Sequence, residues 1–102
     1  MPDFITVAKK SEIENGRIKE YRVAGRVIAV ANVDGEYLAF DGICTHQQCS
    51  LAGGFLDGLT LTCYCHGAQF DIQKGDVLAP PATKSLGIYE VAVEGDDIKI
   101  QL

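Results

Sequence analysis

Several features are missing from this chain of 102 residues, and their absence excludes whole classes of protein. The longest aliphatic stretch, Val27 to Ala31, is too short to span a bilayer. Residues 1–10 contain neither an apolar signal core nor a twin-arginine pair. We therefore expect a cytoplasmic protein with no membrane attachment. The formal net charge of -5 argues against nucleic acid as a partner.

Histidine is also scarce, since the chain contains only two, and each lies within two residues of a cysteine. Cys44-Thr45-His46 reads C-x-H, and Cys63-Tyr64-Cys65-His66 reads C-x-x-H, with sixteen residues between His46 and Cys63. If neither stretch binds a metal, this pairing of every histidine with a cysteine is a coincidence. The pattern therefore predicts a metal centre.

The spacing within each stretch brings a thiol and an imidazole to one site. In an extended backbone, residues i and i+2 point the same way, so Cys44 and His46 share a side. The longer spacing from Cys63 to His66 requires a tighter turn, which Gly67 permits. If the chain is extended there, neighbouring side chains diverge, so Cys63 is a better second thiolate than Cys65.

Two thiolates and two imidazoles form the ligand set of a [2Fe-2S] centre in which two histidines replace two cysteines on one iron. Two thiolates leave the oxidised cluster neutral, so it is easier to reduce than a cluster with four thiolates. Two alternatives remain open. One is a zinc site, for which C-x-H is atypical. The other is a set of structural thiols and surface histidines without metal.

The rest of the sequence predicts an all-β protein forming one domain of residues 1–102. Asp34-Gly35 is the strongest hairpin signal, because a type I′ turn needs positive φ at both positions. A glycine-rich insert interrupts the strands, and we expect a small cluster-binding subdomain at about residues 41–79, carried on an antiparallel β-sandwich. The expected strands cover residues 4–8, 17–23, 26–33, 36–40, 59–64, 69–72, 77–78, 86–94 and 97–102.

Over nearly its whole length the chain resembles Rieske-type [2Fe-2S] proteins, above all the small ferredoxins of bacterial aromatic-ring dioxygenase systems. The resemblance is carried by both ligand stretches, by Ser50–Gly54, by Gly67-x-x-Phe70 and by Leu78–Ala82. It implies that Cys44 and Cys63 bind the inner iron, and that His46 and His66 bind the outer iron. It also implies that Ala79–Ala82, with Pro80 and Pro81, covers the cluster.

The function implied by this resemblance is one-electron transfer rather than catalysis. The donor would be an NAD(P)H-dependent flavin reductase and the acceptor a terminal oxygenase. No second Cys/His/carboxylate cluster is present to bind a mononuclear iron, so we expect a carrier and not the oxygenase itself. The alternatives are a Rieske subunit of a nitrite reductase or of a quinol-linked chain.

Two pairs of residues point to different branches of the family. Cys49 and Cys65 match positions that form a disulfide in quinol-oxidising Rieske subunits, so the resemblance implies a Cys49–Cys65 bridge. Conversely, Ala68 and Phe70 stand where high-potential members carry Ser and Tyr, whose hydroxyls donate to the cluster sulfurs. Neither side chain here donates, so we expect a potential in the lower half of the Rieske range of about -150 to +300 mV.

The acidic residues lie mainly with the motif. Residues 41–102 carry eight acidic and three basic side chains, whereas residues 1–40 carry six of each. Four aspartates around the ligand stretches either steer a basic partner or are solvated loop acids: Asp41, Asp57, Asp71 and Asp76. The phenylalanines Phe40, Phe55 and Phe70 are predicted to belong to the core.

Overall fold

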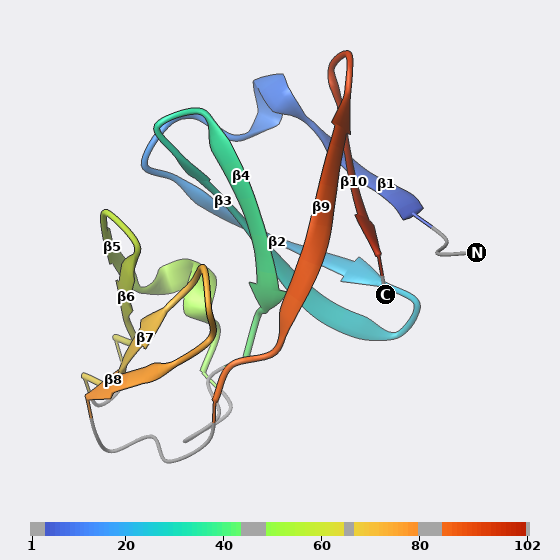
Figure 1. Cartoon of the computed structure of the whole chain (residues 1–102). Coiled ribbons are helices and arrows are strands. Elements are labelled where there is room, and N and C mark those ends of the chain that lie inside the picture. Colours follow the sequence, from blue (N-terminus) through green and yellow to red (C-terminus); the bar gives the residue numbers. More distant parts are fainter. Residues whose placement is uncertain (1–3, 44–48, 65–66, 80–84, 102) are drawn as a thin grey trace.

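The computed structural model describes residues 4–43, 49–64, 67–79 and 85–101, and the account below is confined to them. They form ten strands and two short 3₁₀ helices (Figure 1). In chain order these are β1 (Phe4–Lys9), η1 (Lys10–Glu12), β2 (Ile18–Val23), β3 (Arg26–Val33), β4 (Glu36–Asp41), η2 (Leu51–Gly53), β5 (Phe55–Asp57), β6 (Thr60–Thr62), β7 (Gln69–Asp71), β8 (Val77–Ala79), β9 (Ile88–Glu94) and β10 (Asp97–Gln101).

The strands form two antiparallel sheets of different size. The large sheet has six strands in the order β1-β10-β9-β4-β3-β2, and the small sheet has four in the order β5-β6-β7-β8. Figure 1 shows the small sheet at the lower left, beside the end of β4. The all-β antiparallel fold predicted from the sequence is confirmed.

One apolar cluster lies inside the large sheet, which folds over on itself. Ile98 and Ile100 of β10 pack with Ile28 and Val30 of β3, and all four are fully buried. The large sheet thereby forms both layers around this cluster, with β1 and β10 facing β2 and β3. Burial of these side chains stabilises the large sheet by about 2 kcal/mol for each.

A second apolar cluster joins the two sheets. Leu61 of β6 and Phe70 of β7 pair across the small sheet and point inward, where they pack with Ala29 and Ala31 of β3. Strand β3 therefore buries alternate residues in different clusters, Ile28 and Val30 in one, the two alanines in the other. The continuous apolar middle of β3 is therefore buried on both faces.

The local structure differs from the sequence prediction mainly in the small sheet. Asp34 and Gly35 have φ of 52° and 88°, so the I′ hairpin is confirmed. Strand β5 and helix η2 were not predicted, because an element of three residues is too short to show the hydrophobic period of a strand or a helix. Both described helices have three residues, and no helix in the described ranges has the length and apolar character needed to cross a membrane.

Candidate metal centre

Of the four predicted ligands, one lies within the described residues and three lie outside them. Cys63 is described. Six other predicted site residues lie outside the described residues: Cys44, His46, Cys65, His66, Pro80 and Pro81. Three more are described, namely Cys49, Ala68 and Phe70. The geometry of the centre is therefore derived from Cys63 and from the residues that flank each ligand segment.

Cys63 lies at the end of β6, at the start of a tight turn. Its backbone N–H donates to the carbonyl of Ala68 at 2.7 Å, and the Gly67 N–H donates to the Cys63 carbonyl at 3.1 Å. Gly67 has a φ of +78°, a conformation that costs glycine little and other residues more. These two hydrogen bonds close the turn, as the C-x-x-H-G spacing predicts.

The Cys63 side chain is buried in an apolar environment. It is 2% exposed and packs in the same cluster as Ala68, Phe70 and Leu51. Cys49, which is half-buried, packs against this cluster. The structure thus brings together Cys49, Cys63, Ala68 and Phe70, which span 22 residues of sequence, counting both ends.

The described residues that flank the first ligand segment, residues 44–48, are hydrogen-bonded to one another. Ile43 and Ser50 form an antiparallel bridge, and the Leu51 N–H donates to the Gly42 carbonyl at 2.8 Å. The Ser50 hydroxyl also donates to the Glu20 carboxylate of β2 at 2.6 Å. The described residues on either side of the segment are therefore joined to each other, and Ser50 ties them to β2 of the large sheet.

Residues 80–84 are also flanked by backbone hydrogen bonds. Before them, Ala79 pairs with Gln69 across the small sheet. After them, the Leu86 N–H donates to the Gly75 carbonyl at 2.8 Å, and Gly87 accepts from the Asp41 N–H at 2.9 Å. The segment that carries the two prolines therefore starts on the small sheet and returns to the end of β4.

Two of the four aspartates proposed to steer a partner have structural roles instead. Asp41 accepts a hydrogen bond from the Tyr89 hydroxyl at 2.5 Å. Asp71 accepts from the backbone N–H groups of Gln73 and Lys74, at 2.8 and 3.2 Å, and so caps its own turn. Asp57 and Asp76 are exposed and remain candidates for steering.

The prediction that Phe55 belongs to the core is wrong. Phe40 and Phe70 are fully buried as predicted, but Phe55 is 71% exposed on the edge strand β5. It pairs with Thr62, on the opposite face of the small sheet from buried Leu61. Strand alternation turns Phe55 outward, and the unpredicted strand β5 is the reason that the sequence did not reveal it.

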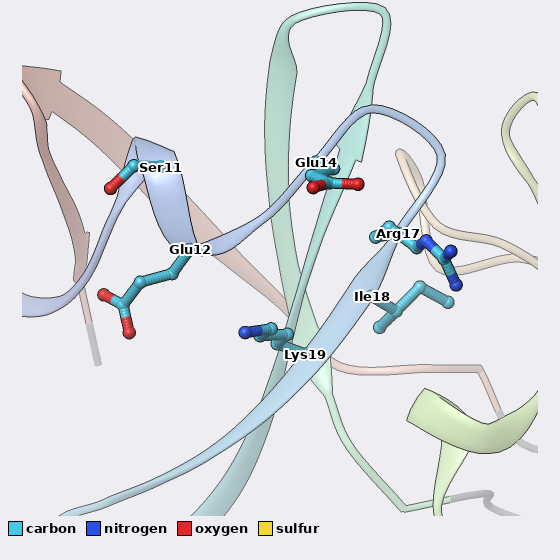
Figure 2. A pocket seen from close by; sticks show the side chains of 6 residues that line it. All are labelled: Ser11, Glu12, Glu14, Arg17, Ile18 and Lys19. Atoms are coloured by element: carbon cyan, nitrogen blue, oxygen red, sulfur yellow. The ribbon is translucent and has the colours of Figure 1, made fainter.

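Two described cavities lie away from Cys63. Figure 2 shows the first, which has a volume of about 450 Å³ and is lined by both acidic and basic side chains. Its lining residues are Ser11, Glu12, Glu14, Arg17, Ile18 and Lys19. The second, of about 270 Å³, lies against the Asp34-Gly35 hairpin and is lined by Asn15, Gly16, Val33, Asp34, Leu56 and Gly58. Cys49, Cys63, Ala68 and Phe70 line neither of these two cavities.

The donor set fits an iron–sulfur centre. A thiol buried among apolar groups resists ionisation unless a metal compensates the charge, which a [2Fe-2S] cluster does. The described ranges contain no group of three or more His, Cys, Asp or Glu able to hold a metal. This agrees with the position of three of the four predicted ligands outside those ranges.

The model of the Rieske [2Fe-2S] domain family matches residues 3–90. The chain belongs to the Rieske [2Fe-2S] domain family. Its cofactor is accordingly a Rieske-type [2Fe-2S] cluster. The resemblance inferred from the two ligand stretches is confirmed.

Curated relatives of this Rieske protein are ferredoxin components. The ferredoxin component of a naphthalene 1,2-dioxygenase system from Pseudomonas aeruginosa is 35% identical over 89% of this chain and 88% of its own length. A naphthalene 1,2-dioxygenase/salicylate 5-hydroxylase ferredoxin component from Ralstonia sp is 32% identical, over 98% and 96%. Both alignments span nearly the whole of each ferredoxin.

Solved structures agree in fold. A Sphingomonas yanoikuyae B1 ferredoxin superposes with a TM-score of 0.92 at 29% identity, covering 98% of this chain and 99% of its own. A chain from a complex of reduced oxygenase and oxidised ferredoxin in carbazole 1,9a-dioxygenase gives 0.89 at 31% identity, covering 96% and 92%. A nitrite reductase small subunit gives 0.82 at 12% identity, which shows the fold alone.

Proposed function

We propose that this protein carries single electrons from an NAD(P)H-dependent flavin reductase to the terminal oxygenase of an aromatic-ring dioxygenase system. The observation that carries the proposal is the near full-length match to ferredoxin components of such systems. One related structure is described as a complex of oxygenase and ferredoxin, which supports the acceptor. We also propose the cytoplasm as the site of action, because the donor oxidises NAD(P)H there.

Within this proposal the cluster is held by Cys44, His46, Cys63 and His66. The thiolates of Cys44 and Cys63 bind one iron, and the imidazoles of His46 and His66 bind the other. When bound, the cluster supplies a one-electron redox centre whose imidazole ligands couple reduction to proton uptake at alkaline pH. The chain's own contribution is to hold Cys63 rigidly in the closed turn and to exclude water around its thiolate.

We propose a single Rieske domain over residues 1–102, with the cluster-binding subdomain at about residues 41–79. The small sheet, from Phe55 to Ala79, supports this division because it lies within that interval and packs on β3 through one shared cluster. Pro80 and Pro81 follow directly after β8, and we propose that they cover the cluster.

We further propose a disulfide between Cys49 and Cys65. Cys49 packs against the apolar cluster that contains Cys63, which supports its proximity to the second ligand stretch. Such a bridge would tie the two ligand segments together. The test is mass measurement of the intact holoprotein after alkylation without reductant, where labelling of both cysteines would contradict the bridge.

The absence of hydroxyls at Ala68 and Phe70 is proposed to lower the potential. Ala68 is 1% exposed and Phe70 fully buried, and both pack in the cluster with Cys63. No hydroxyl hydrogen donates from either position, so the reduced, more negative centre lacks two stabilising bonds. Ala68→Ser combined with Phe70→Tyr should raise the potential. An unchanged value would contradict this explanation.

The first experiment is a spectroelectrochemical titration of the purified protein, repeated across pH. A potential in the lower half of the range of about -150 to +300 mV, falling only at alkaline pH, supports the ferredoxin function. A value near the top of that range would favour the quinol-linked alternative instead. Co-purification with a siroheme-containing partner would favour the nitrite reductase alternative.

A further inference from the structure

The end of β4 is held to the start of β9 by a side-chain hydrogen bond. The Tyr89 hydroxyl donates to Oδ1 of Asp41 at 2.5 Å. Arg26, at the start of β3, acts in the opposite direction to Asp41 and lowers the pKa of the Tyr89 hydroxyl. Because the acceptor is a carboxylate, the bond is of the strong, charge-assisted kind. It holds the Asp41 side chain in one orientation.

That orientation brings the carboxylate against the backbone of Gly87. A Cβ at position 87 would lie 2.9 Å from Cγ of Asp41 and closer still to Oδ2, so only glycine fits without displacement. The φ of Gly87 is not in the left-handed region, so contact rather than backbone conformation requires glycine here. The Gly87 carbonyl in turn accepts from the Asp41 N–H at 2.9 Å.

The opposite side of the same backbone packs on the small sheet. The Leu86 N–H donates to the Gly75 carbonyl at 2.8 Å. Gly75 is buried with a φ of +82°, and a Cβ there would collide with the Leu86 carbonyl. Leu86-Gly87 is therefore clamped between the end of β4 and the turn that precedes β8.

The position of this clamp along the chain gives it a role in the metal centre. Asp41 stands three residues before Cys44, and Gly87 stands three residues after the 80–84 segment. Gly75 lies between β7, which contains Phe70, and β8. The contact between Asp41 and Gly87 thus joins the residues before the first ligand to the residues after the proline segment. The hydrogen bond from Leu86 to Gly75 joins the same residues to the small sheet.

We propose that Asp41 is a positioning residue for electron transfer, whose carboxylate, oriented by Tyr89, clamps Leu86-Gly87 and thereby fixes the end of β4, three residues before the proposed ligand Cys44. The inference rests on the proposed function, because it concerns the cluster held by Cys44. A rigid ligand segment rearranges little when the electron arrives or leaves, and it resists loss of the cluster.

The test compares variants of the cluster-loaded protein. Tyr89→Phe removes the hydroxyl donor, and Tyr37→Phe is the matched control, since the Tyr37 hydroxyl of β4 donates to the Lys10 carbonyl of η1. Two rates are measured well below the melting temperature: cluster loss, from visible absorption, and electron self-exchange, from NMR line broadening. We expect Tyr89→Phe to speed cluster loss about five-fold and to slow self-exchange, with Tyr37→Phe at wild-type rates.

A second pair of variants tests the steric contact. Gly87→Ala should speed cluster loss at least as much as Tyr89→Phe, because the new methyl displaces the Asp41 carboxylate. In an Asp41→Ala background, where the methyl has room, Gly87→Ala should add nothing further. Additive effects of the two substitutions would overturn the proposed contact.

The outcomes separate this inference from the proposed function. If Tyr89→Phe and Gly87→Ala lower only the melting temperature and leave both rates at the wild-type value, Asp41 is merely structural and the inference is wrong. If the wild-type protein takes up the cluster but transfers no electron to any of a panel of aromatic-ring dioxygenase oxygenases, naphthalene 1,2-dioxygenase and biphenyl dioxygenase among them, the proposed function fails and the comparison among variants stands. Failure of the wild type to take up any cluster would overturn both.

Discussion

The large and small sheets are built from strands of very different length. Strands of the large sheet run for five to eight residues and enclose their own core around Ile98 and Ile100. Each strand of the small sheet has three residues, and its core is completed by β3 and by Cys63. Short strands with a one-sided core are marginal alone, so the small sheet depends on the large one and on the metal centre.

The strongest test of this difference removes a proposed ligand. Cys63→Ser should abolish cluster binding, because an alcohol replaces the buried thiolate that the inner iron requires. Amide hydrogen exchange in β6 and β7 should then accelerate, while β3 and β10 keep their protection. Loss of protection in both sheets together would show that they form one cooperative unit.

The next largest effect is expected in the core of the large sheet. Ile98→Ala should cost about 3 kcal/mol of unfolding free energy, because Ile98 is fully buried and its truncation leaves a cavity. Chemical denaturation measures this cost. Val93→Ala is the control, since Val93 is 43% exposed and should change stability by about 0.5 kcal/mol or less. The midpoint potential should not change in either variant.

A smaller effect of opposite sign is expected at Tyr21 on β2. Its hydroxyl is buried and has no hydrogen-bond partner among the described residues. Burial, and then the charge of Glu12, raise the pKa of Tyr21 above its usual 10.0. Tyr21→Phe should therefore stabilise the protein by about 1 kcal/mol. Tyr37→Phe, which removes a hydroxyl that has partners, should destabilise it, and equal effects would refute the distinction.

The smallest effect concerns pH. Burial raises the pKa of Tyr89 above 10.0, the hydrogen bond to Asp41 and its charge add to this, and Arg26 opposes it. Because the pKa is raised in the folded state, the hydroxyl's contribution to the free energy of unfolding is fully present below about pH 10. This contribution is lost as the pH rises through the pKa of the folded protein. The stability difference between wild type and Tyr89→Phe should therefore shrink above pH 10. A constant difference in melting temperature across pH 8 to about 12 would contradict this assignment.

Much of the large sheet could be predicted from the sequence. The bounds of β3 were predicted without error, because turn signals stand at both ends of an apolar run. The Asp34-Gly35 turn was predicted for a similar reason, since its conformation depends on two neighbouring residues. The small sheet was harder, because strands of three residues show no period, and so β5 and the exposure of Phe55 were missed.

The family and the candidate ligands follow from the sequence alone, because only one or two residues separate the thiol from the imidazole in each stretch. Asp71 caps its own turn through residues two and three positions away, so its role is local. The orientation of Asp41 by Tyr89 and the close approach that Gly87 allows require the tertiary structure. Those roles arise from contacts such as that between Asp41 and Tyr89, which are 48 residues apart in the chain. Such contacts exist only once β4 and β9 lie side by side, and no local pattern of residues encodes them.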